Sequence, residues 1–181
     1  MNTFIALLRG INVGGKTVIP MPELKSSFAA MGLEDVSTYI QSGNVVFSGP
    51  TGDAQSLAVA IEERIAETFG HSTTVLLRTP AELAEIAGSN PFLDRDADRS
   101  KLHVVFLSGS PDANAVAELD PARSPPDEFA VRRREIYLHL PNGAGRSKLT
   151  IDYFEKRLGV RATARNWKTV NKLLELTQNG R

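Results

Sequence analysis

The segment Thr3-Phe4-Ile5-Ala6-Leu7-Leu8-Arg9 predicts a β-strand close to the start of the chain. All of the residues between Thr3 and Arg9 are apolar, so neither side of the strand suits contact with water. This pattern is typical of a strand at the centre of a sheet that is covered on both faces. We therefore expect another part of the chain, or a second subunit, to cover the face that the sheet's own helices leave open.

Working outward from this strand, the pattern of residues predicts the order β-α-β-β-α-β. Helices are indicated by apolar residues at 3.6-residue spacing, and strands by short β-branched or aromatic runs. The predicted elements are a helix that opens at Pro20-Met21-Pro22 and ends at Gly32, strands Val36–Gln41 and Asn44–Ser48 around the turn Ser42-Gly43, a helix Asp53–Phe69 and a strand Thr73–Arg78.

A short helix and a loop are predicted next. Thr79-Pro80-Ala81-Glu82 combines an N-cap, a proline at the first helical position and the glutamate of a capping box. The helix ends near Gly88, and the loop Ser89–Ser100 follows. The same order of elements then recurs. Its members are a strand Leu102–Leu107, a helix capped at Ser110-Pro111, strands Phe129–Arg132 and Ile136–Leu140, a helix Thr150–Leu158, a strand Val160–Ala164 and a last helix Trp167–Gln178.

The repeated order predicts an α+β protein of two tandem ferredoxin-like (β-α-β-β-α-β) halves packed together, plus a C-terminal helix. We expect residues 1–79 to form the first half, residues 80–100 a connecting helix and loop, and residues 101–181 the second half with the C-terminal helix. The two halves share no obvious sequence identity.

Composition argues against several classes of partner. The chain has 21 basic and 21 acidic residues, so it lacks the basic excess of proteins that hold duplex nucleic acid through many phosphates. No run approaches the ~20 apolar residues that span a bilayer, and the N-terminus has no signal-peptide pattern. The chain also has no cysteine. We expect a cytoplasmic protein, without membrane contact and with nucleic acid disfavoured as a partner; a homo-oligomer stays open.

Gly10-Ile11-Asn12-Val13-Gly14-Gly15-Lys16-Thr17 matches the phosphate-loop expression G-x-x-x-x-G-K-[ST]. In a true phosphate loop the Gly-Lys-Ser/Thr begins the helix, so that the helix dipole points at the anion. Here the prolines place the helix start near residue 21. The pattern therefore favours a structural loop or a different anion-binding loop over a site that hydrolyses nucleotides.

Three blocks of sequence resemble the bacterial family catalogued as domain of unknown function 1697. They are Ala6–Gly15, Tyr39–Phe47 and Thr163–Val170. The resemblance implies a fold with ferredoxin-like halves and no particular substrate. Where members of the family usually show a Gly-Gly-Lys/His-Asn-Lys-like loop, this chain has Lys16-Thr17-Val18, and that difference creates the phosphate-loop match by chance.

Basic residues beside glycines or at helix N-termini suit anion binding, and they define the candidate site. The candidate ligand-binding residues are Arg9, Gly10, Asn12, Gly14, Gly15, Lys16, Ser42, Asn44, Ser147, Lys148, Arg165 and Asn166. If the loops of the two halves converge, these residues form one cationic pocket. The alternative is that Asn166 is only an N-cap, that the arginines lie in solvent, and that Ser42 and Asn44 belong to a plain hairpin tip.

The best hypothesis for function is a cytosolic protein that binds a small anionic or phosphorylated ligand. One alternative is an enzyme that acts on such a ligand by electrostatic stabilisation, and another is a module that binds single-stranded nucleic acid. No catalytic residue can be named and no cofactor is predicted. No metal site is predicted either, because the histidines are isolated and Asp94–Asp98 only mimics the start of a calcium loop.

Overall fold

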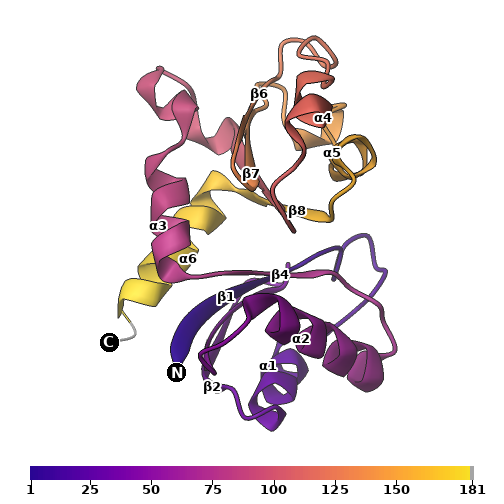
Figure 1. Ribbon diagram of the computed structural model, residues 1–181, viewed down its shortest axis with the longest axis vertical. Helices are drawn as coiled ribbons and strands as arrows, with labels where there is room; N and C mark the ends of the chain where they lie inside the picture. The colour runs from indigo at the N-terminus through magenta and orange to yellow at the C-terminus, as the bar shows by residue number, and fades with distance from the viewer. Residues whose placement is uncertain (180–181) are drawn as a thin grey trace. The chain divides into compact units, whose positions relative to one another are not determined.

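The computed structural model describes residues 1–179, which form two four-stranded antiparallel sheets and six α-helices. The chain divides into two compact units, one formed by Met1–Ala84 with the residues from Leu173 onward, the other by Glu85–Lys172. Figure 1 labels the elements of both. None of the described helices is long and apolar enough to cross a membrane.

The first unit contains one complete β-α-β-β-α-β set. Its elements are β1 (Asn2–Leu8), α1 (Met21–Ala30), β2 (Glu34–Tyr39), β3 (Asn44–Gly49), α2 (Ala54–Phe69) and β4 (Val75–Arg78). The strand order is β2-β3-β1-β4, so β1 lies inside the sheet as predicted. In Figure 1, α1 and α2 lie together on one face of this sheet.

Both faces of β1 are buried. Phe4, Ala6 and Leu8 belong to the core formed with α1 and α2. Ile5 and Leu7 point to the opposite face and are also 0% exposed. The expectation of a second covered face is therefore correct.

The connection between the two sets holds α3 (Pro80–Gly88) and two short 3-10 helices, η1 (Pro91–Asp94) and η2 (Arg99–Lys101). The predicted capping box is present: the Thr79 amide donates to the Glu82 carboxylate at 2.8 Å, and the Glu82 amide donates to Thr79 Oγ1 at 3.2 Å. The predicted loop Ser89–Ser100 therefore contains η1 and most of η2.

The second unit repeats the same topology. Its elements are β5 (Leu102–Leu107), α4 (Ala113–Ala117), β6 (Glu128–Arg132), β7 (Glu135–His139), η3 (Ala144–Arg146), α5 (Ile151–Leu158) and β8 (Ala162–Asn166), and α6 (Trp167–Asn179) completes the chain. The order β6-β7-β5-β8 matches that of the first sheet. Several predicted ends differ by one or two residues, and two of the differences have a visible cause. Asp112, and not Ser110-Pro111, caps α4, and the last strand extends to Asn166 because Arg165 and Asn166 pair with β5.

Candidate functional site

The glycine-rich segment after β1 folds into a small hairpin. The Asn12 amide donates to the Thr17 carbonyl at 3.0 Å, and the Lys16 amide donates to the Val13 carbonyl at 3.2 Å. Gly14 and Gly15 form the turn, with φ of 61° and 71°; two successive positive φ angles are typical of a tight hairpin turn. Two of the backbone amides that a phosphate loop would offer to an anion, those of Asn12 and Lys16, are therefore used within the hairpin.

The helix that follows begins too late for a phosphate loop. α1 begins at Met21, after Pro20, and Lys16 and Thr17 lie in the hairpin before it. The dipole of α1 therefore does not point at an anion held by the Gly-Lys-Thr segment. This geometry agrees with the sequence-based preference for a structural loop.

Asn12 holds this hairpin against the turn between β2 and β3. Its Nδ2 donates to the carbonyls of Ile19 at 2.9 Å and Gln41 at 2.7 Å, and its Oδ1 accepts from the Ile19 amide at 2.8 Å. Both hydrogens of the side-chain amide are thereby used. To bind a ligand through its side chain, Asn12 would have to give up these hydrogen bonds.

Ser42 and Asn44 shape the neighbouring turn. Asn44 is 0% exposed, and its Nδ2 donates to the Tyr39 carbonyl and to Ser42 Oγ, both at 3.0 Å. The Leu8 amide donates to the carbonyl of Gly43 at 2.9 Å. A Cβ at Gly43 would lie 2.8 Å from side-chain atoms of Leu8 and Ile11, so only glycine fits there. The structure thus brings Asn12, Ser42 and Asn44 into one region through contacts that support the fold.

The remaining predicted residues of the first unit lie at the surface. Lys16, Gly10, Gly14 and Gly15 are exposed. Arg9 is half-buried, and its carbonyl accepts from Thr73 Oγ1 at 2.7 Å.

The predicted residues of the second unit separate into two groups. Ser147 and Lys148 precede α5, and Ser147 Oγ accepts from the Leu149 amide at 3.0 Å. Asn166 caps α6, since its Oδ1 accepts from the Thr169 amide at 2.9 Å, which agrees with the plain N-cap interpretation.

The interpretation of Arg165 as a solvated side chain is wrong. It is 7% exposed within β8, and its Nη1 donates to Thr163 Oγ1 at 2.8 Å and to the Ala164 carbonyl at 2.7 Å. Burial lowers the pKa of the Arg165 guanidinium to about 10, because desolvation disfavours the charged form.

A hollow that sequence reasoning missed lies beside α5. It has a volume of about 500 Å³, and the residues that line it are Arg123, Thr150, Asp152, Tyr153, Lys156 and Arg157. We call it the cationic hollow, because three of these side chains are basic and one is acidic. Tyr153, Lys156 and Arg157 share one side of α5 through their i, i+3, i+4 spacing, which the sequence could have indicated. Arg123 comes from a loop without a recognisable pattern.

The guanidinium of Arg123 is fixed from two directions. Its Cζ lies 3.9 Å from the centroid of the Tyr153 ring, and its Nε donates to the Lys148 carbonyl at 2.9 Å. The Tyr153 hydroxyl in turn accepts from the Asp120 amide at 3.2 Å. A second cation, Arg157, lies 5.8 Å from the same ring centroid.

The two loops beside the cationic hollow are joined by hydrogen bonds at Lys148. The Lys148 amide donates to Ser124 Oγ at 3.0 Å, and Ser124 Oγ donates to the Asp127 carboxylate at 2.7 Å. Ser124 and Asp127 are buried. The peptide groups on either side of Lys148 are therefore held by adjacent residues, Arg123 and Ser124.

Comparison with known proteins identifies the family. The family model described as "Protein of unknown function (DUF1697)" matches residues 1–137, which is more than half of the chain. The chain belongs to the DUF1697 family. The matched range includes the hairpin after β1 and Arg123, and it ends before α5. No curated protein matches.

A solved structure shares the fold of this DUF1697 protein. It is described as the structure of conserved bacterial protein SP0830 from Streptococcus pneumoniae, with 23% sequence identity, a TM-score of 0.77 and coverage of 99% of both chains. At this identity the likeness concerns the fold alone. The sequence-based resemblance to the family is confirmed.

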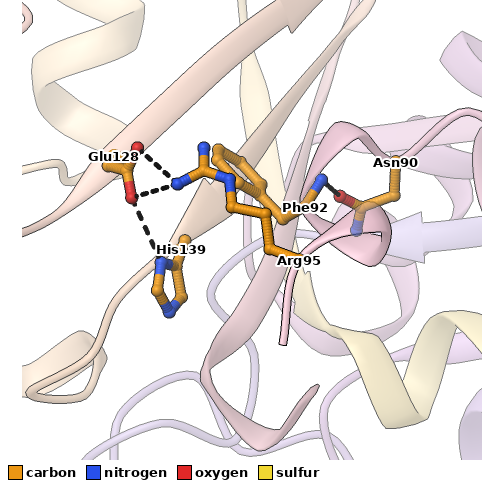
Figure 2. A network of polar contacts seen from close by, with 5 residues as sticks. All are labelled: Asn90, Phe92, Arg95, Glu128 and His139. Atoms are coloured by element: carbon orange, nitrogen blue, oxygen red, sulfur yellow. Dashed lines mark hydrogen bonds and ion pairs between the residues drawn. The ribbon is translucent and has the colours of Figure 1, made fainter. Parts of the chain in front are cut away.

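A second polar cluster in the DUF1697 chain lies at β6 and β7 (Figure 2). The Glu128 carboxylate accepts two hydrogen bonds of 2.9 Å from Arg95 Nη1, and His139 Nδ1 lies 3.5 Å from it. Burial opposes ionisation of Glu128, but the hydrogen bonds from Arg95 and His139 outweigh it and lower the pKa of this carboxyl. Because the carboxylate neutralises Arg95, this cluster is poorly suited to an anion.

Phe92 completes this cluster. The Arg95 guanidinium lies 4.9 Å from its ring centroid, and Asn90 Oδ1 accepts from the Phe92 amide at 3.0 Å. The Phe92 ring also packs against His139, with 5.9 Å between ring centroids. This contact and the Arg95–Glu128 pair attach the η1 segment to β6 and β7. Within residues 1–179, no group of three or more His, Asp or Glu side chains is placed to hold a metal ion.

Proposed function

We propose that this protein binds a small anionic or phosphorylated ligand in the cationic hollow of its second unit. The observation that carries the proposal is the fixed guanidinium of Arg123, held by the Tyr153 ring and by the Lys148 carbonyl. Within residues 1–179, no hydrogen-bond acceptor is found for its two terminal nitrogens.

A guanidinium in a fixed position is a good anion receptor. Its planar fork matches the oxygens of a carboxylate or a phosphate, and such charge-assisted pairs are about twice as strong as neutral hydrogen bonds. Because two contacts already restrict Arg123, a ligand would bind without first ordering a mobile side chain, which lowers the entropic cost of binding.

The basic side chains around Arg123 also favour an anionic ligand. Lys156 and Arg157 are exposed and line the hollow with Arg123, whereas Asp152 is its one carboxylate. Lys148, a residue that sequence reasoning selected, belongs to the loop that holds Arg123. These positive charges would supply attraction over a distance as well as direct contacts.

The test is a calorimetric titration of the full chain with inorganic phosphate and with ribose 5-phosphate. We expect both to bind, and we expect Arg123→Ala to weaken each by at least about tenfold, the loss of roughly 1.4 kcal/mol of binding free energy. Arg123→Lys should give an intermediate loss, because lysine keeps the charge but lacks the planar fork.

Arg99→Ala is the matched control, since Arg99 is an exposed arginine of η2 that does not line the hollow. It should bind both probes as the wild type does. If neither probe binds, or if Arg123→Ala and Lys156→Ala bind them with unchanged affinity, the proposed function is wrong.

The wider pocket that sequence reasoning outlined, with Arg9 and Lys16 beside Lys148 and Arg165, stays a prediction. The burial of Arg165 places one restriction on it. With 7% of its surface exposed and with Thr163 and Ala164 as partners, Arg165 could reach a ligand only by giving up contacts that it makes within β8.

A further inference from the structure

The face of the aromatic ring in the cationic hollow is already covered by an arginine. Tyr153 is 8% exposed, and Arg123 lies over its ring at 3.9 Å. Its ring also packs against Phe154, with 5.3 Å between centroids. Proteins that hold nucleobases by stacking present an open aromatic face to the base, and Tyr153 offers no such face.

The other residues of the cationic hollow recognise charge and hydroxyl groups. The lining side chains are three cations, Arg123, Lys156 and Arg157, and one carboxylate, Asp152, so their net charge is 3 − 1 = +2. A phosphate monoester carries about −1.5 to −2 at neutral pH, which complements this charge. A carboxylate such as that of Asp152 only accepts hydrogen bonds, and it therefore suits hydroxyl donors.

From these features, and resting on the proposed function, we infer that the ligand is a phosphate monoester of a compact, hydroxyl-rich molecule, held without a stacked base. The phosphoryl group pairs with Arg123 and Lys156, and the hydroxyl groups face Asp152 and Thr150. A nucleotide binds here through its phosphate and sugar alone.

The experiment compares ribose 5-phosphate, adenosine 5′-monophosphate, adenosine and inorganic phosphate by calorimetry with the full chain. A stacked base would add roughly fivefold or more to affinity. We expect the two phosphate esters to differ by less than fivefold, and adenosine to show no binding. Tighter binding of adenosine 5′-monophosphate by more than that factor, or measurable binding of adenosine, overturns the inference.

Asp152→Asn tests the role of the hydroxyl groups. Removal of the negative charge should strengthen the binding of inorganic phosphate, while the ratio of the affinity for ribose 5-phosphate to that for inorganic phosphate should decrease. An unchanged or larger ratio counts against the inference. The proposed function would fail on a different result: either no phosphate probe binds, or Arg123→Ala leaves the affinity for phosphate unchanged. The thermal unfolding midpoint of each variant shows whether it is folded.

Discussion

Arg78 and Arg165 make the same contact in corresponding strands of the two halves. The Nη1 atom of Arg78 donates to the carbonyl of Leu77 at 3.0 Å, and Nη1 of Arg165 donates to the carbonyl of Ala164 at 2.7 Å. The two arginines are 2% and 7% exposed. Each lies in the last strand of its sheet, β4 or β8, next to the first strand, β1 or β5.

The likeness extends to the next residue. Thr79 follows Arg78 and accepts from the amide of Glu82, and Asn166 follows Arg165 and accepts from the amide of Thr169. In both halves the chain therefore runs from a buried arginine through a capping side chain into a helix, α3 or α6. Sequence comparison of the halves does not reveal this repeat, because the capping residue is threonine in one half and asparagine in the other, although both residues can cap a helix.

Replacement of either buried arginine should destabilise the protein. We expect Arg78→Ala and Arg165→Ala each to lower the free energy of unfolding by about 2–4 kcal/mol, because buried partners lose hydrogen bonds and a cavity remains. Urea denaturation measures the change. The exposed arginine variant Arg99→Ala should stay within about 0.5 kcal/mol of the wild type; a similar small effect at Arg165 would contradict a stabilising role for its contacts.

Asn12→Ala should loosen the hairpin after β1. The substitution removes three hydrogen bonds, to Ile19 twice and to Gln41 once, and alanine tolerates the positive φ of 54° poorly. We expect a loss of about 2–3 kcal/mol in unfolding free energy. Faster amide exchange in residues 12–19 should accompany it, whereas Asn142→Ala at an exposed turn should change neither measurement.

Ile40 is strained in the native state. It has a φ of 49° and is 50% exposed, so a β-branched residue takes a left-handed conformation with little burial in return. Ile40→Asn should raise the free energy of unfolding by about 1 kcal/mol, because asparagine adopts this conformation more readily. Val18, an exposed β-branched residue without a positive φ, provides the control: Val18→Asn should give no gain, and equal gains at both positions would refute the strain argument.

Tyr137 should make stability sensitive to alkaline pH. Burial raises its pKa from 10.0 to about 12, and its hydroxyl donates to the Ile86 carbonyl at 2.8 Å. Between these two values the unfolded chain has lost the phenol proton and the folded protein retains it. The contribution of Tyr137 to stability is therefore complete below pH 10 and falls by up to about 1.4 kcal/mol for each pH unit above it.

Titration of Arg165 has the opposite effect on stability above pH 10. Its pKa is lowered in the folded protein, so the folded protein releases this proton before the unfolded chain does, and the free energy of unfolding rises with pH. Comparison of Tyr137→Phe with the wild type isolates the tyrosine. Urea denaturation at pH 9, 10 and 11 should show a less steep decline for the variant, together with a loss of about 1 kcal/mol at neutral pH. Parallel declines would show that Tyr137 does not titrate as described.

Much of the fold could be predicted because its signals are local. The apolar run Phe4–Leu8 indicated a covered central strand, and the capping box at Thr79 and Glu82 indicated the start of α3; both are present. Errors occurred where pairing with a neighbouring strand decides the boundary. Arg165 and Asn166 extend β8 because β5 provides hydrogen-bond partners for them, and their own sequence carries no such information.

The candidate site was harder to predict because side chains with the same chemistry serve different roles. Asn12 and Asn44 were selected as polar ligands, yet their amides satisfy backbone carbonyls of nearby turns. Arg165 was selected as a ligand-binding cation, and it is buried within β8. In the opposite sense, Arg123 was overlooked, because nothing in the proline-rich segment Asp120–Asp127 indicates that it reaches α5.

By itself, the sequence determined which segments form strands and helices and in what order, because periodicity and capping act over a few neighbouring residues. The tertiary structure alone decided that Arg123 meets Tyr153 and the carbonyl of Lys148. Such contacts depend on the path that each loop takes between packed elements. The packing of the whole unit sets that path, so the sequence of a loop alone does not reveal which side chains it will contact.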